Sequence, residues 1–179
     1  MQAIPPKDSN MTISYYNASV PVFKQGLNSL KGILAKAEAH ATAKNIDADA
    51  FLKARLFPDM LNLTRQVQIA ADFAKGVPAR LANVEVPPYE DNEASFADLQ
   101  ARLDKTLAFI EALKPEQFDG AADREIVLRP GTPKEKRFTG EAYLLHYGIQ
   151  HFLFHVTTAY DIFRHNGVEV GKSDYIGTY

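Results

Sequence analysis

Apolar side chains recur every three or four residues along most of the chain, and this spacing predicts four long helices. The expected helices cover residues 13–44, 58–76, 96–113 and 138–166, with a short helix over residues 50–57. Each long segment has a single apolar stripe, so each helix must bury one face against the others. We therefore expect an all-α protein built as a four-helix bundle.

Residues that favour helix ends lie at several of the expected boundaries. Ser95 suits the N-cap of the third long helix, and Asp98 three residues later makes an approximate capping box. Thr139 suits the N-cap of the last helix. Pro58 is expected to open the second helix, at an early position where its missing N–H has no partner to lose. Pro21 interrupts the first helix, whose initial turns should therefore be kinked or separate.

Residues 125–138 depart from the helical pattern. The β-forming run Ile-Val-Leu, followed by RPGTP and KEKRF, predicts a small hairpin or an irregular crossover between the third and fourth helices. The basic residues of this segment either bind a phosphate or form a solvated hairpin face. These residues are Arg129, Lys134, Lys136 and Arg137. The segment after Gly167 has no period and is expected to lie across the bundle.

Length and composition limit the classes of protein that the chain can represent. Residues 1–10 have no periodicity and are expected to form a loose tail, which leaves residues 11–179 as one helical domain. A net charge of −2 gives no electrostatic reason to bind nucleic acid or an anionic membrane. No apolar run approaches the roughly 18 residues of a membrane span. The N-terminus lacks the apolar core of a signal peptide, which favours the cytoplasm.

Four of the five histidines lie in the last long helix, and two of them fall on its inner stripe. His151 and His155 are one helical turn apart, so both imidazoles can approach one atom from the same side. Divalent zinc, nickel or iron suits such ligands. Alternatively, each ring hydrogen-bonds to a neighbouring helix or a water. Gly148 and Ala159 on the same stripe are small enough to leave room near the rings.

Three segments carry a resemblance to a known family. They are TISYYNASVPVF near the start, RLFPDMLNLTRQVQIAADFAK on the second helix and FHVTTAYDIFRHNGVEVGKSDYIG at the end. From residue 11 onward the chain resembles the DinB-like superfamily of four-helix bundles, and more closely a branch known only as a domain of unknown function. The resemblance implies this fold over nearly the whole chain.

The resemblance also implies a metal site, because DinB-like proteins typically bind a divalent ion through three histidines. His151 and His155 match the pair on the last helix. The second helix has no histidine, and Gln66 or Gln68 stands about where the third ligand is expected; we take Gln66 as that ligand. The near branch more often has Pro-Asn where this chain has Gln150-His151, so His155 is the firmer match.

Two functional hypotheses follow. The first is a DinB-like protein that binds one divalent ion, zinc or nickel, and acts as a transferase or hydrolase; some family members transfer low-molecular-weight thiols. Tyr143, Tyr147 or Asp161 would line its site. The second is a metal-free module that binds a small apolar ligand beside the small residues of the inner stripe, or forms a homodimer. Leu153 and Phe154 fall off that stripe and would pack on the tail, the first helix or a second subunit.

Overall fold

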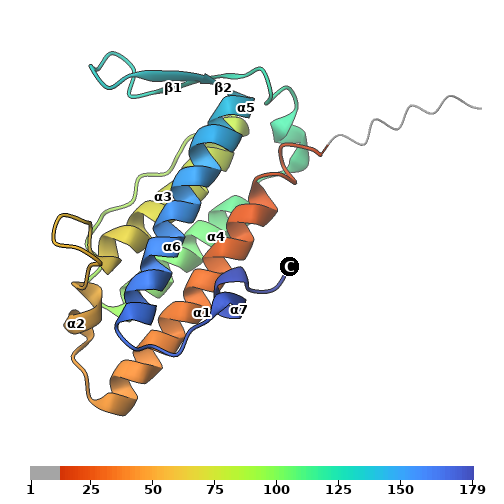
Figure 1. Ribbon diagram of the computed structural model, residues 1–179. Coiled ribbons are helices and arrows are strands. Elements are labelled where there is room, and N and C mark those ends of the chain that lie inside the picture. The colour runs from red at the N-terminus through yellow and green to blue at the C-terminus, as the bar shows by residue number, and fades with distance from the viewer. Residues whose placement is uncertain (1–12) are drawn as a thin grey trace, which may run out of the picture.

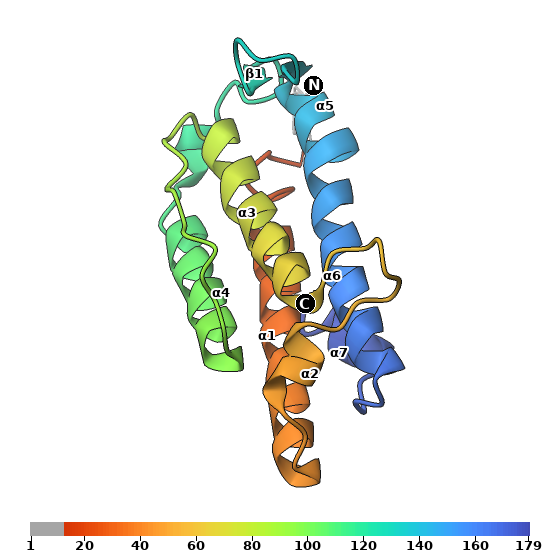
Figure 2. The ribbon, with the colours of Figure 1, turned by 90° about the vertical axis from the view of Figure 1, so that its left-hand side faces the viewer.

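The computed structural model describes residues 13–179 and contains the predicted bundle of long helices (Figures 1 and 2). These helices are α1 (Val20–Lys44), α3 (Leu63–Leu81), α4 (Phe96–Glu111) and α6 (Ile149–His165). Helix α3 packs against α4 on one side and against α6 on the other. The tail expected over residues 1–10 lies outside the described residues.

Shorter elements connect the long helices. They are α2 (Ala48–Leu52), the 3₁₀ turn η1 (Pro115–Phe118), β1 (Glu125–Leu128), β2 (Lys136–Thr139), α5 (Gly140–Ala142), the π-helical η2 (Tyr143–Gly148) and α7 (Lys172–Ile176). Strands β1 and β2 form the predicted hairpin, antiparallel with Glu125 opposite Thr139. The hairpin lies across one end of the bundle, where β2 leads directly into α5, η2 and α6 (Figure 1).

The apolar stripes of the long helices form the core, as their periodicity predicts. On α3, the side chains of Leu63, Val67, Ala70 and Ala74 have no exposed surface. The rings of Phe23 and Phe152 meet edge to face at 5.0 Å and join α1 to α6. Each such large side chain contributes about 1.5–3 kcal/mol by leaving water. None of the helices within residues 13–179 is both long and apolar enough to cross a membrane.

The boundaries of α3 differ from the prediction. The helix begins at Leu63 rather than Pro58, because the Asn62 side chain accepts a hydrogen bond from the Arg65 N–H and caps the helix there. At the other end α3 continues beyond Pro78. A proline in the last turn removes a single hydrogen bond, and the packing of the surrounding buried residues outweighs this loss. The Asn62 cap and the packing of α3 thus outweigh the local effects of Pro58 and Pro78.

The first two helices are also shorter than expected. Helix α1 begins at Val20 and holds Pro21 in its first turn, so the preceding turns are separate from it. Helix α2 covers Ala48–Leu52 instead of residues 50–57, because the Asp47 side chain accepts the N–H of Asp49 and caps it earlier. Pro21 thus accounts for the start of α1, and the Asp47 cap for the start of α2.

The other predicted helix ends are confirmed. Ser95 accepts a hydrogen bond from the Asp98 N–H at 3.1 Å, and Thr139 accepts one from the Ala142 N–H at 3.3 Å. Gly167 follows the end of α6 with φ of 85°, in the left-handed region that glycine adopts readily. These short-range rules hold because the cap and its partner lie within one turn of each other.

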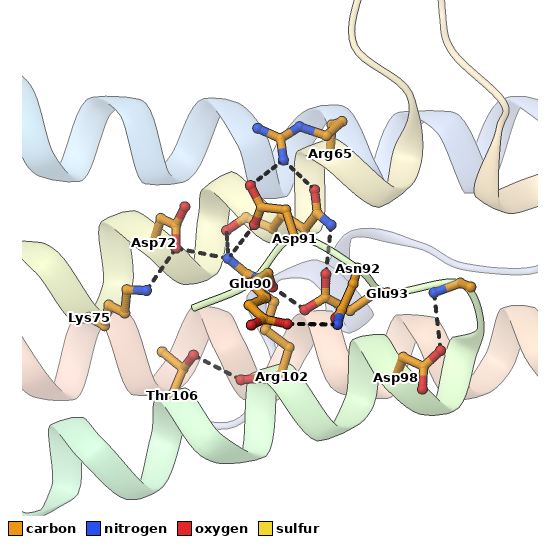
Figure 3. A network of polar contacts seen from close by, with 12 residues as sticks. Arg65, Asp72, Lys75, Glu90, Asp91, Asn92, Glu93, Asp98, Arg102 and Thr106 are labelled. Atoms are coloured by element: carbon orange, nitrogen blue, oxygen red, sulfur yellow. Dashed lines mark hydrogen bonds and ion pairs between the residues drawn. The ribbon is translucent and has the colours of Figure 1, made fainter. Parts of the chain in front are cut away.

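A buried arginine fixes the long α3–α4 loop to both helices (Figure 3). Arg102 of α4 is 4% exposed, and its guanidinium lies 2.8 Å from Glu93, 2.9 Å from Asp72 and 3.1 Å from Asp91. Burial alone would raise the pKa of Glu93, but hydrogen bonds from Arg102 and Gln68 outweigh it and lower that pKa. The carboxylate therefore stays ionised and compensates the buried cation.

The C-terminal segment lies across α1, as expected, and includes the short helix α7. Gln25 donates to the Ile176 carbonyl at 2.9 Å, and Lys36 donates to Asp174 at 2.6 Å. Leu153 of α6 borders a shallow recess together with Ile176. The tail thus covers part of the α6 surface that faces away from the inner stripe.

Candidate functional site

The last long helix packs closely against α3 at Gly148. A Cβ added at Gly148 would lie 2.7 Å from Val77 Cγ2 of α3, closer than two carbon atoms can approach. The missing side chain therefore lets the two helices come together. Val77 fills the room that we expected beside Gly148. An apolar ligand cavity beside Ala159 stays a prediction.

His151 and His155 lie half-buried on the part of α6 that faces α3. Both rings stack on Phe73 of α3, with centroid distances of 4.8 and 6.1 Å and interplanar angles of 23° and 19°. The two imidazoles therefore share one aromatic neighbour, in agreement with their one-turn spacing. The ring of the exposed Phe154 meets His155 at 5.2 Å, nearly perpendicular to it.

Hydrogen bonds define the tautomer of both rings. His151 Nδ1 lies 2.7 Å from the Tyr147 carbonyl oxygen, and His155 Nδ1 lies 2.7 Å from Gln66 Oε1. The amide orientation of Gln66 is set by its Nε2, which donates to the Leu61 carbonyl at 3.0 Å. Both acceptors are oxygens, so in the neutral form of each ring Nδ1 carries the hydrogen and Nε2 keeps its lone pair.

The Nε2 atoms are available to an added group. No hydrogen bond within the described part of the chain uses Nε2 of His151 or His155, and neither atom is completely buried. Burial, and to a lesser extent the charge of His151, lowers the pKa of His155 to about 4. His155 is therefore neutral at physiological pH, with a lone pair that can accept a hydrogen bond or bind a metal ion.

The donors at this position fit an incomplete metal site. Gln66 lies next to the pair, but its oxygen accepts the His155 Nδ1–H; its role as a ligand stays a prediction. Gln68 belongs to the network around Arg102. Residues 13–179 contain no cluster of three His, Cys, Asp or Glu side chains that could hold an ion. Two imidazoles with open positions fit the geometry, whereas a complete three-histidine site does not.

A cavity of about 270 Å³ lies between α3, the end of β1 and η2. Its walls include Phe73, Arg80, Leu128, Arg129, Tyr143 and Tyr147. Phe73 and Tyr147 also contact His151, at centroid distances of 4.8 and 4.1 Å. Tyr143 and Tyr147 line this cavity, whereas Asp161 borders a separate recess beside α7. Their predicted place at a metal site stays a prediction.

Sequence reasoning missed Phe73 and Arg80, although a signal for both exists. Gln66, Phe73 and Arg80 are spaced by seven residues on α3, and positions 143, 147, 151 and 155 are spaced by four on the last helix. The two rows face each other: Gln66 bonds His155, Phe73 stacks on the middle of the opposite row, and Arg80 bonds the Tyr143 hydroxyl at 3.2 Å. The site is therefore a strip between two helices rather than a single point.

Comparison with known proteins places the chain in a family. The family described as "Domain of unknown function (DUF1993)" matches residues 15–176. The crystal structure of a DinB family member protein from Shewanella denitrificans is similar, with a TM-score of 0.86 and 41% sequence identity over 92% of each chain. No curated protein matches the chain. The chain therefore belongs to the DUF1993 family and has the helical fold of its DinB-family neighbour.

Proposed function

We propose that His151 and His155 bind one divalent ion, zinc or nickel, and that the protein acts on a small molecule as a transferase or hydrolase. The observation that carries this proposal is the hydrogen bonding of the rings: both Nδ1–H groups are held by oxygens and both Nε2 atoms are free. Metal-binding histidines almost always have such an outer partner, because it fixes the tautomer and the ring orientation.

Protein groups would orient the ligands and leave space for a substrate. Gln66 holds the His155 ring through its Oε1, and Phe73 covers both imidazoles and shields them from water. When bound, the ion would supply a Lewis acid that polarises a substrate oxygen or lowers the pKa of a bound water. With two imidazoles and no anionic ligand, we expect weaker binding than at a site with three protein ligands.

Metal titration of tag-free protein tests this proposal. We expect one zinc or nickel ion per chain by calorimetry and elemental analysis, and its loss in His155→Ala. Gln66→Leu should weaken binding by about 10- to 100-fold, because the His155 ring loses its outer partner. His165→Ala changes an exposed histidine on the same helix and should leave binding unchanged. Absence of binding to zinc, nickel and manganese would contradict the proposal.

Metal-free binding of a small molecule is a second candidate. It is favoured by the cavity of about 270 Å³, because two of its lining residues, Phe73 and Tyr147, also contact the His151 ring. The two candidates differ in the response to EDTA: chelation should abolish ligand binding in the first and leave it unchanged in the second. If EDTA-treated protein binds a ligand and the His151→Ala variant does not, the metal-free candidate is favoured.

A further inference from the structure

Two guanidinium groups without a carboxylate partner line the cavity between α3, β1 and η2. Arg80 donates to the Gly76 carbonyl at 3.0 Å and to the Tyr143 hydroxyl at 3.2 Å, and it forms no ion pair within residues 13–179. The side chain of Arg129 has neither an ion pair nor a hydrogen bond among the same residues. Arg80 is half-buried and Arg129 is exposed, and neither cation is neutralised by a carboxylate of the described chain.

The carboxylate that lines the cavity does not supply a counter-ion for either arginine. Asp72 lies 2.9 Å from Arg102 and 3.0 Å from Lys75, and both cations belong to the network of Figure 3. With Asp72 matched by these partners, the cavity carries the excess positive charge of Arg80 and Arg129. Such a concave, partly desolvated positive site favours an anion.

Tyr143 adds a hydrogen-bond donor to the two cations. Its side chain is 1% exposed, and its hydroxyl oxygen accepts the hydrogen bond from Arg80. Arginine can only donate, so the hydroxyl hydrogen of Tyr143 remains free. No acceptor within residues 13–179 takes this hydrogen. A buried phenol with a free O–H, beside two guanidinium groups, suits an oxyanion.

The rest of the cavity wall is apolar and aromatic. Phe73, Leu128 and Tyr147 form it, and Lys136 lies 5.3 Å over the outer part of the Tyr147 ring. The basic hairpin cluster considered in the sequence is divided in the structure. Arg137 pairs with two glutamates at the surface, whereas Arg129 lines the cavity.

We propose that this cavity binds a small aromatic anion, with its carboxylate or phosphate on Arg80, Arg129 and the Tyr143 hydroxyl and its ring against Phe73 and Tyr147. Guanidinium groups match the geometry of both oxyanions. A volume of about 270 Å³ suits a single-ring compound. The binding does not require a metal ion, although the ring would lie beside the residues that contact His151.

Calorimetric titration of the EDTA-treated full chain with benzoate, phenyl phosphate and benzamide tests the proposal. We expect saturable binding of at least one anion, and at least about tenfold weaker binding of benzamide, the neutral counterpart of benzoate. The anion with the higher affinity, benzoate or phenyl phosphate, shows whether the site prefers a carboxylate or a phosphate. Arg129→Asn should weaken binding by about tenfold or more and retains a side chain that tolerates the positive φ of 52°.

A matched control and a second variant make the test specific. Arg137→Gln removes a surface cation from the same hairpin and should leave the affinity unchanged. Tyr143→Phe removes only the hydroxyl and should weaken binding of the anion but not of benzamide. Equal affinity for benzoate and benzamide, unchanged affinity in Arg129→Asn, or no saturable heat with any probe would each overturn the proposal. Because EDTA is present throughout, a failure of metal binding leaves this outcome unaffected.

Discussion

At the scale of single residues, the site depends on how each imidazole places its one hydrogen. The side-chain oxygen of Gln66, 89 residues away in sequence, accepts it from His155, and a backbone oxygen one turn earlier accepts it from His151. Periodicity predicted that both rings share one face of the helix. It could not predict the partner of His155, because that contact depends on how two distant helices pack.

Burial of His155 should make the stability of the metal-free protein depend on pH. Its pKa of about 4 lies below the ordinary value of 6.5, so the unfolded chain takes up the proton first as the pH falls. The free energy of unfolding therefore keeps its full value above pH 6.5 and falls between about pH 6.5 and 4. After allowance for solvent screening, we expect a loss on the order of 1–2 kcal/mol.

Urea unfolding across this pH range checks the prediction, together with the NMR titration of His155 in EDTA-treated protein. His155→Gln should reduce the pH dependence. His165→Gln, at an exposed position of the same helix, should not change it. A His155 titration midpoint near 6.5 would contradict the expected burial of its neutral form.

At the scale of elements, the site is a strip where α3 faces η2 and α6. The positions that form it recur every seven residues on one side and every four on the other, so their faces are visible in the sequence. The sequence does not show that these two faces meet, because each long helix could pack against any of three others. The late start of α3 has a different origin: the capping side chain of Asn62 outweighs the proline signal at Pro58.

Gly148→Ala should destabilise the protein by about 1–3 kcal/mol, because the added methyl group would meet Val77 and force α3 and α6 apart. Gly32→Ala on α1 is the matched control. Nothing lies within 4 Å of a Cβ added at Gly32, so alanine should be neutral or stabilise by about 0.5–1 kcal/mol. Equal unfolding free energies for the two variants by urea denaturation would show that the close approach at Gly148 is unimportant.

At the scale of the whole molecule, apolar side chains remain exposed near one end of the site. Phe57 and Leu61 lie on the α2–α3 loop with exposed fractions of 63% and 45%, and Phe154 of α6 is 56% exposed. Figure 2 shows this loop beside α6. The Leu61 carbonyl accepts from Gln66, which in turn bonds His155, the neighbour of Phe154. Large exposed apolar patches commonly mark interfaces.

We propose that this surface forms a homodimer. Light scattering after size exclusion should give twice the chain mass, and Phe154→Asp should shift the protein to monomer, because a desolvated charge opposes apolar contact. Tyr179→Asp is the control: this residue is 99% exposed and lies outside the surface. A monomeric wild-type protein at high concentration would rule out the dimer.

The π-helical turn η2 contributes Tyr143 and Tyr147 to the site and joins the hairpin to α6 through α5. It contains one residue more than an α-helical turn would need, and such turns lengthen a helix by a single inserted position. Deletion of one residue between 143 and 148 would rotate everything before it by about 100° relative to α6. The hairpin and Arg129 would then move away from the cavity beside α3, while His151 and His155 would keep their positions on α6. Loss of one codon in this turn would therefore change the cavity in a descendant gene while α6 keeps both histidines on one face.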